Sequence, residues 1–145
     1  MYKGQRVLVV IPARGGSKGI PRKNLRLVNG LPLISYVIKK SLQSIYVDKV
    51  VVSTDDEEIA AVSTFFGAEI IRRPDVLAGD SVPLDPVIYH AVDCLERNNE
   101  KYDLIITLQP TLPLISEASL NKGIVKAVDE AYDTVIGVSD ETHLY

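Results

Sequence analysis

VVIPARGGSKGIPRKN, residues 9–24, joins the pattern of a buried strand directly to a loop rich in glycine and basic residues. The apolar run VLVVI (7–11) does not alternate with polar residues, which is typical of a strand covered on both faces in a parallel sheet. The loop contains three glycines and no acidic residue. Its basic residues are Arg14, Lys18, Arg22 and Lys23. Ligands of open parallel sheets bind beyond the carboxyl ends of the strands, so this loop is the first candidate for a binding site.

Other apolar runs repeat the strand pattern along the chain. They are VVVS (50–53), LIITL (104–108), TVIGV (134–138) and the weaker EIIR (69–72). Helical patterns lie between these runs, and buried strands that alternate with helices indicate parallel pairing. The sequence therefore predicts one domain over residues 1–145 with an α/β fold, a three-layer sandwich around a mostly parallel central sheet.

Four helices are expected, and each has a recognisable start. Pro32 suits the first helical position of LISYVIKKSL. Asp55 is a suitable N-cap for the second helix, and Glu58 three residues later would complete a capping box, so Asp55 and its acidic neighbour are interpreted as a helix start rather than a catalytic pair. The third helix is expected from Ser81, after which apolar residues recur at helical offsets. The fourth is expected from Ser116 to about residue 128.

The composition is that of an ordinary globular domain. Hydrophobic residues make up 46% and charged residues 24%, which excludes a disordered chain, and no apolar run has the length of a membrane span. The single cysteine, Cys94, excludes an internal disulfide framework and a multi-cysteine zinc site. The N-terminal residues lack the pattern of a secretory signal, so a cytoplasmic location and no membrane partner are expected.

The net charge of −3 conceals an asymmetry along the chain. The first 47 residues contain nine of the 16 basic residues and none of the 19 acidic residues, so a segment of charge +9 precedes one of −12. Local basic charge in an acidic protein indicates an anionic ligand bound in that segment. The pI of about 5.4 argues against a protein that coats nucleic acid.

The glycine-rich loop does not match either of two familiar phosphate loops. A Rossmann fingerprint needs glycine where Arg14 stands, and no Walker Gly-Lys-Ser/Thr sequence occurs. The backbone N–H groups of a long glycine-rich turn can still approach an anion closely. Arg14 offers a planar fork to phosphate oxygens, and Lys18 and Lys23 offer point charges, so we expect a polyphosphate here rather than a solvated basic turn.

The segment IPARGGSKGIPRKN resembles the N-terminal signature of the acylneuraminate cytidylyltransferases, which include CMP-sialic acid synthetases and enzymes for pseudaminic and legionaminic acids. Further matching segments follow in order: NGLPLISYVI, VVVSTDDEEIA, FGAEIIRRP, LAGDSVPLDPVI and LQPTLPL. The resemblance implies a nucleotide-diphospho-sugar transferase fold. It also implies an enzyme that joins CTP to the anomeric hydroxyl of an acidic nine-carbon sugar, releasing pyrophosphate with the help of Mg²⁺.

The resemblance also implies roles for individual residues. Arg14, supported by Lys18 and Lys23, would hold the triphosphate and favour the departing pyrophosphate. Gln109 would contact the acyl sugar. The residues expected to bind the nucleotide are Ala13, Arg14, Asn24, Arg73, Ser81 and Val82.

Two segments depart from the family pattern. Val82 stands where similar proteins have a small hydroxyl residue, so we expect contact there through the backbone or through Ser81, which could equally serve only as a helix N-cap. Relatives often read Gln-Pro-Thr-Ser-Pro-Leu-Arg after the strand at 104–108. This chain has Leu112 for the serine and Ile115 for the arginine, which leaves the identity of the sugar open.

The resemblance places the Mg²⁺ ligands and much of a dimer contact beyond residue 145. We therefore expect an N-terminal part of a longer homodimeric protein, with no metal ligand in these 145 residues. Two alternatives stay open. One is a cytidylyltransferase for the eight-carbon sugar acid Kdo, whose loop looks like Ala-Arg-Phe-x-Ser-x-Arg-Leu-Pro-x-Lys, and the other is a non-catalytic nucleotide-binding module.

Overall fold

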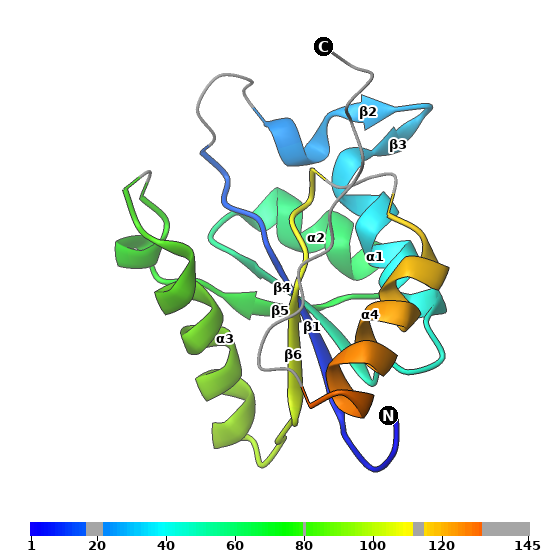
Figure 1. Cartoon of the computed structure of the whole chain (residues 1–145). Helices are drawn as coiled ribbons and strands as arrows, with labels where there is room; N and C mark the ends of the chain where they lie inside the picture. Colours follow the sequence, from blue (N-terminus) through cyan, green and yellow to red (C-terminus); the bar gives the residue numbers. More distant parts are fainter. Residues whose placement is uncertain (17–21, 80, 112–114, 132–145) are drawn as a thin grey trace.

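The computed structural model describes residues 1–16, 22–79, 81–111 and 115–131 (Figure 1). Within these residues, the central sheet has four parallel strands in the order β5-β4-β1-β6. The strands are β1 (Val7–Pro12), β4 (Lys49–Thr54), β5 (Glu69–Arg72) and β6 (Leu104–Thr107). The predicted parallel sheet is confirmed, and the ends of these strands lie within one residue of the predicted ranges. The strand predicted over residues 134–138 lies outside the described residues.

Helices cover both faces of the sheet and complete three layers (Figure 1). One face is packed by α1 (Leu33–Gln43), α2 (Glu57–Phe65) and α4 (Glu117–Asp129), and the other by α3 (Leu84–Arg97). The three-layer α/β sandwich predicted from the sequence is therefore confirmed.

The burial of strand β1 on both faces explains the continuous apolar run at residues 7–11. All six of its residues are buried. Val7, Val9 and Ile11 pack into the cluster formed with α1, α2 and α4, whereas Leu8 and Val10 pack into the cluster formed with α3. Successive side chains of a strand point to opposite faces, so helices on both faces require apolar residues at every position.

The first two helices begin one residue later than expected. Pro32 is the N-cap of α1 rather than its first helical residue, because it belongs to a short strand pair and keeps an extended backbone. Asp56 rather than Asp55 caps α2, and its side chain accepts a hydrogen bond from Ile59 N–H at 2.9 Å. The capping box predicted from Asp55 and Glu58 is therefore wrong, although the helix itself is confirmed.

The third helix begins at Leu84, three residues after the expected start at Ser81. Its N-cap is Pro83, and a residue that precedes a proline disfavours helical backbone angles. Val82 therefore does not extend the helix backwards, and the interpretation of Ser81 as its N-cap is wrong. The fourth helix, expected from Ser116, begins at Glu117 with Ser116 as its N-cap, and the Ser116 hydroxyl accepts from the backbone N–H three residues later at 3.0 Å.

A two-stranded antiparallel ribbon lies at the carboxyl end of the central sheet (Figure 1). Its strands β2 (Leu27–Val28) and β3 (Leu31–Pro32) are joined by Asn29 and Gly30, both with positive φ, as a type I′ hairpin turn requires. Short 3₁₀ helices stand at η1 (Lys23–Leu25), before the ribbon, and at η2 (Asp75–Leu77), after β5. Within the described ranges, no helix combines the length and the apolar character that crossing a membrane would take.

Candidate functional site

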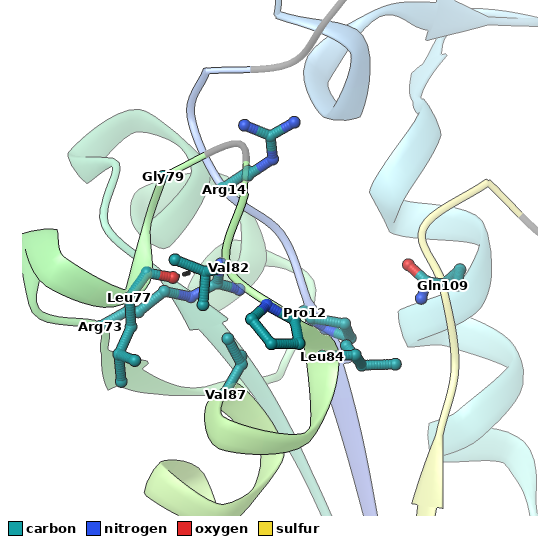
Figure 2. A pocket seen from close by; sticks show the side chains of 10 residues that line it. Pro12, Arg14, Arg73, Leu77, Gly79, Val82, Leu84, Val87 and Gln109 are labelled. Atoms are coloured by element: carbon teal, nitrogen blue, oxygen red, sulfur yellow. Dashed lines mark hydrogen bonds between the residues drawn. The ribbon is translucent and has the colours of Figure 1, made fainter.

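A pocket of about 160 Å³ opens at the carboxyl end of the central sheet, where the sequence predicts the site (Figure 2). The ends of β1, β5 and β6 and the start of α3 contribute to its wall. The lining residues are Pro12, Arg14, Arg73, Leu77, Gly79, Val82, Pro83, Leu84, Val87 and Gln109. Four residues predicted from the sequence, Arg14, Arg73, Val82 and Gln109, therefore lie around one pocket. Figure 2 shows Gln109 approaching from the β6 side, apart from the group around Arg73.

Arg73 forms a buried part of the pocket wall, with 7% of the residue exposed. Its backbone N–H donates to Thr54 O at 2.8 Å, which extends the pairing of β4 with β5 by one residue. Its Nε donates to Ser53 Oγ at 3.2 Å and its Nη2 to Ser53 O at 3.0 Å. Nη1 lies 3.4 Å from Leu77 O. Strand β4 and the turn η2 thus hold the guanidinium in a fixed orientation.

The electrostatic surroundings of Arg73 are unusual for a buried cation. The oxygens that accept its hydrogen bonds carry no formal charge. Burial lowers the pKa of Arg73, the charge of Asp55 raises it, and the positive charge of Arg14 lowers it. Because Arg14 and Arg73 face the same pocket, the site favours a multiply charged anion.

The position of Arg14 is set by its neighbours in the chain and in space. Ala13 N–H donates to Ser53 O at 2.9 Å, so sheet pairing continues to the residue before Arg14. The side-chain amide of Asn24 donates to Arg14 O at 3.2 Å, and Asn24 is buried. Lys23 precedes Asn24 in η1. The structure therefore brings Ala13, Arg14 and Asn24 together, with Asn24 supporting the backbone of Arg14.

The acidic residues at the start of α2 contact the glycine-rich loop. Asp55 Oδ1 accepts from Gly15 N–H at 2.9 Å. Both terminal nitrogens of Arg22 donate to the Asp56 carboxylate, with Nη2 at 3.1 Å from Oδ1, and Nη2 also lies 2.6 Å from Glu58 Oε2. Hydrogen bonding from Arg22 lowers the pKa of Asp56, while burial raises it to a lesser extent.

Sequence reasoning missed this second role of the acidic pair. Asp56 does cap α2, but it also binds Arg22, and Asp55 binds the loop instead of capping the helix. A signal was present in the sequence. The basic loop follows β1 and an acidic run follows β4, and adjacent parallel strands bring such segments to the same end of the sheet.

Other predicted site residues lie elsewhere or outside the described residues. Lys18 and Leu112 fall outside the described ranges. Ser81 is exposed and does not line the pocket. Ile115, which stands where relatives often have arginine, is half-buried and packs against the hydrophobic core. That position thus contributes to packing in this chain.

Over the described ranges, no group of three or more histidine, cysteine, aspartate or glutamate residues is arranged to hold a metal ion.

Comparisons with known proteins agree with the motifs. A family model described as cytidylyltransferase matches residues 8–143. Pseudaminic acid cytidylyltransferase from Campylobacter jejuni is 43% identical over 126 residues, which are 86% of this chain and 52% of that protein. N-acylneuraminate cytidylyltransferase A from Danio rerio is 36% identical over 137 residues, which are 94% of this chain and 31% of that protein. The chain thus spans about half the length of the first relative and less of the second.

A solved structure extends the likeness to three dimensions. The structure of CMP:2-keto-3-deoxy-manno-octonic acid synthetase in complex with CTP superposes with a TM-score of 0.71 at 26% identity. The match covers 87% of this chain and 48% of the other.

Proposed function

The chain belongs to the cytidylyltransferase family, and from that premise we propose that it forms the nucleotide-binding part of an enzyme that activates a sialic-type nonulosonic acid with CTP. The observation that carries the proposal is the pocket in which Arg14 and the buried Arg73 converge at the carboxyl end of a parallel sheet. The relatives named for pseudaminic acid and for N-acylneuraminate support the class of sugar.

The proposed reaction transfers CMP to the sugar. The anomeric hydroxyl oxygen of the sugar acid attacks the α-phosphorus of CTP and releases its proton to solvent, the new P–O bond forms, and the bond to the departing pyrophosphate breaks with its electron pair. Chemistry of this kind depends mainly on positioning and on stabilising charge. Arg14, with Lys23 and with Lys18 outside the described ranges, would bind the triphosphate and stabilise the negative charge that develops on pyrophosphate.

The remaining pocket residues would bind the rest of the substrates. Arg73 would lie near the cytosine or its ribose, and Val82 near the nucleotide. A pocket of about 160 Å³ is smaller than sites that enclose a whole ligand, which fits a site that takes part of the nucleotide while the triphosphate extends to the loop. Gln109, on the β6 side, would contact the acyl sugar through its amide.

Family membership also suggests a divalent cation, Mg²⁺, which would neutralise phosphate charge. The described residues do not provide a cluster of side chains that fits this ion. We expect its ligands to lie in a longer form of the protein, together with a homodimer contact, and we expect a cytoplasmic location without nucleic-acid or membrane partners.

The proposal is tested by calorimetric titration of the chain with CTP, with ATP and NAD as competitors for specificity. Arg14→Ala is expected to weaken CTP binding by about 1.5–3 kcal/mol, the size of a charge-assisted hydrogen bond. Arg26→Ala, an exposed arginine of the same basic segment that does not line the pocket, is the matched control. A folded chain that does not bind CTP, or that binds equally well after Arg14→Ala, would contradict the proposal.

A second assay separates the candidate sugars. Pyrophosphate release is measured with CTP and N-acetylneuraminic acid, pseudaminic acid or Kdo, in the longer form of the protein that is expected to hold the Mg²⁺ ligands. Turnover with a nine-carbon acid would support the main proposal, whereas preference for Kdo would favour the alternative that the structural neighbour suggests. Binding of CTP without turnover of any sugar would favour the non-catalytic module.

A further inference from the structure

The acidic start of α2 contacts the glycine-rich loop at two points. Asp55 accepts from Gly15 N–H at one end of the loop, and Asp56 binds Arg22 at the other end. These contacts join residues that are 34 to 40 positions apart in the chain. Both described ends of the loop are therefore fastened to the start of one helix.

Asp56 is itself held by hydrogen bonds to helix α2 and to the end of strand β4. Its Oδ1 accepts from Ile59 N–H at 2.9 Å, and its backbone N–H donates to Thr54 Oγ1 at 3.1 Å. A carboxylate that caps a helix and remains charged gives the loop a fixed point of attachment.

The close approach of the loop to Asp55 and Asp56 requires glycine at position 15. A Cβ added at Gly15 would lie 2.7 Å from Asp56 Oδ2 and 2.9 Å from Asp56 Cβ, closer than real Cβ atoms approach other groups. At Gly16, an added Cβ would meet no atom of the described residues within 4 Å. The two neighbouring glycines thus differ, because Gly15 makes room for a protein carboxylate and not only for a ligand.

The second loop residue held at the start of α2 is Arg22, which binds Asp56. Its backbone lies in the left-handed region, with φ 54° and ψ 38°, which is uncommon for a residue other than glycine. Its guanidinium binds the carboxylates of Asp56 and Glu58. The charge of Arg22 is therefore neutralised by protein groups rather than directed to a ligand.

We propose that Asp55 and Asp56 are positioning residues for nucleotide binding. They hold Gly15 and Arg22, and so keep Arg14 in its binding arrangement before the nucleotide arrives. This inference rests on the proposed CTP-binding function of the loop, although the contacts themselves involve different residues. A loop that reaches its binding arrangement only part of the time loses apparent affinity by that fraction.

The main test is a double-mutant cycle on CTP affinity. Asparagine is a good N-cap, so Asp56→Asn keeps the start of α2 and removes the charge. Asp56→Asn and Arg22→Ala are each expected to weaken CTP binding about tenfold. The free energy of unfolding should fall only slightly, by no more than an exposed ion pair contributes. The double variant should bind no more weakly than Arg22→Ala, because that substitution already removes the pair with Asp56 as well as the contact with Glu58. Arg22→Lys should recover part of the affinity. Additive losses, or unchanged affinity in both single variants, would overturn the proposal.

The neighbouring glycines provide a matched pair for the same titration. Gly15→Ala should weaken CTP binding more than Gly16→Ala, because only the first substitution displaces Asp56. An equal or larger loss in Gly16→Ala would count against the anchoring.

Amide hydrogen exchange without nucleotide separates this inference from the proposed function. Gly15 N–H should exchange slowly in the wild type and at least about tenfold faster in Asp55→Ala, because its acceptor is lost. If CTP fails to bind but this difference is present, the proposed function fails and the anchoring stands. If CTP binds but Gly15 exchanges as fast in the wild type as in the variant, the anchoring fails and the function stands.

Discussion

Charged side chains stand at both ends of the parallel sheet, but their partners differ. At the amino end, Lys49 Nζ lies 2.7 Å from Glu69 Oε2 and 2.6 Å from Glu100 Oε2. At the carboxyl end, the guanidinium of Arg73 donates to the hydroxyl and carbonyl oxygens of Ser53. One cation is thus surrounded by carboxylates, and the other is buried against uncharged oxygens beside a pocket.

The two cations also differ in how the fold affects their charge. Burial lowers the pKa of Lys49, but hydrogen bonds from Lys49 to Glu100 and Glu69 more than offset this, and the pKa is raised. Burial lowers the pKa of Arg73. A raised cation pKa means that the charge stabilises the folded state, whereas a lowered one means that the charge costs folding free energy. Such a cost is expected of a residue retained to bind a ligand.

The largest expected effect is on ligand binding at the carboxyl end. Arg73→Met should weaken CTP binding by about 1.5–3 kcal/mol, because it removes a charge and an oriented donor fork from the pocket. The free energy of unfolding should stay within about 1 kcal/mol of the wild type or rise, since the substitution removes a buried charge. Ser53 O also keeps its hydrogen bond from Ala13 N–H.

Calorimetric titration and urea unfolding of Arg73→Met measure these two quantities. A large loss of stability with unchanged CTP affinity would reverse the comparison and make Arg73 a structural residue.

The matched substitution at the amino end should have the opposite outcome. Lys49→Met leaves Glu69 and Glu100 without their shared cation and should lower the free energy of unfolding by about 1 kcal/mol. CTP affinity should be unchanged, because Lys49 stands at the other end of β4 from the pocket. Any parallel loss of CTP affinity in Lys49→Met would break the separation between the two ends.

Much of the fold was predictable because burial imposes a local pattern. In β1, helices on both faces require apolar side chains at every position, and the sequence displays that requirement directly. The start of α3 was misplaced because a serine at a suitable distance suggested a cap, while the effect of Pro83 on the preceding residue decided the boundary. Asp55 and Asp56 are equally good caps, so local sequence did not distinguish them.

The topology alone made the pocket lining predictable where residues follow strand ends, whereas Val82 was expected from the family resemblance. Arg14, Arg73 and Gln109 each follow a parallel strand, so the topology alone brings them to one end of the sheet, and the pocket joins them.

The sequence suggested that the glycine-rich turn leaves its backbone N–H groups open to an anion, whereas the N–H of Gly15 donates to Asp55, and Asp56 lies against its Cα. The contact between Gly15 and the acidic residues depends on how β1 and β4 pair and on which carboxylate caps α2. Neither can be predicted from a local sequence pattern.

Lowering the pH should reduce the free energy of unfolding through carboxylates at both ends of the sheet. The reduction should be smaller than the one expected for Lys49→Met. Burial raises the pKa of Asp48 at the amino end. The hydrogen bond from Val7 N–H and the contacts with the terminal amine together lower this pKa by more, so the net shift is downward. Arg22 lowers the pKa of Asp56 at the carboxyl end. Both carboxylates therefore add stability above the ordinary aspartate pKa of about 3.9, and that stability is lost as the pH falls through the lower folded-state values.

Urea unfolding between about pH 6 and pH 3 measures this dependence, which should set in below about pH 4. Asp48→Asn should flatten the curve while leaving CTP affinity at neutral pH unchanged. Curves with the same slope for Asp48→Asn and the wild type would show that the amino-end carboxylate does not contribute.

The smallest expected effect is a gain at the carboxyl end. Val82 lines the pocket and is half-buried, and the family resemblance implies a small hydroxyl residue at this position. Val82→Thr keeps the branched shape and adds a hydroxyl that water can solvate in the free protein, so the free energy of unfolding should change by less than about 0.5 kcal/mol. One added neutral hydrogen bond should tighten CTP binding by about 0.5 kcal/mol, roughly twofold. Val47→Thr, a half-buried valine just before β4 at the amino end, is the control and should bind CTP as the wild type does. Weaker binding in Val82→Thr would mean that the ligand presents apolar surface to this position, and an equal gain in Val47→Thr would mean that the effect does not arise at the pocket.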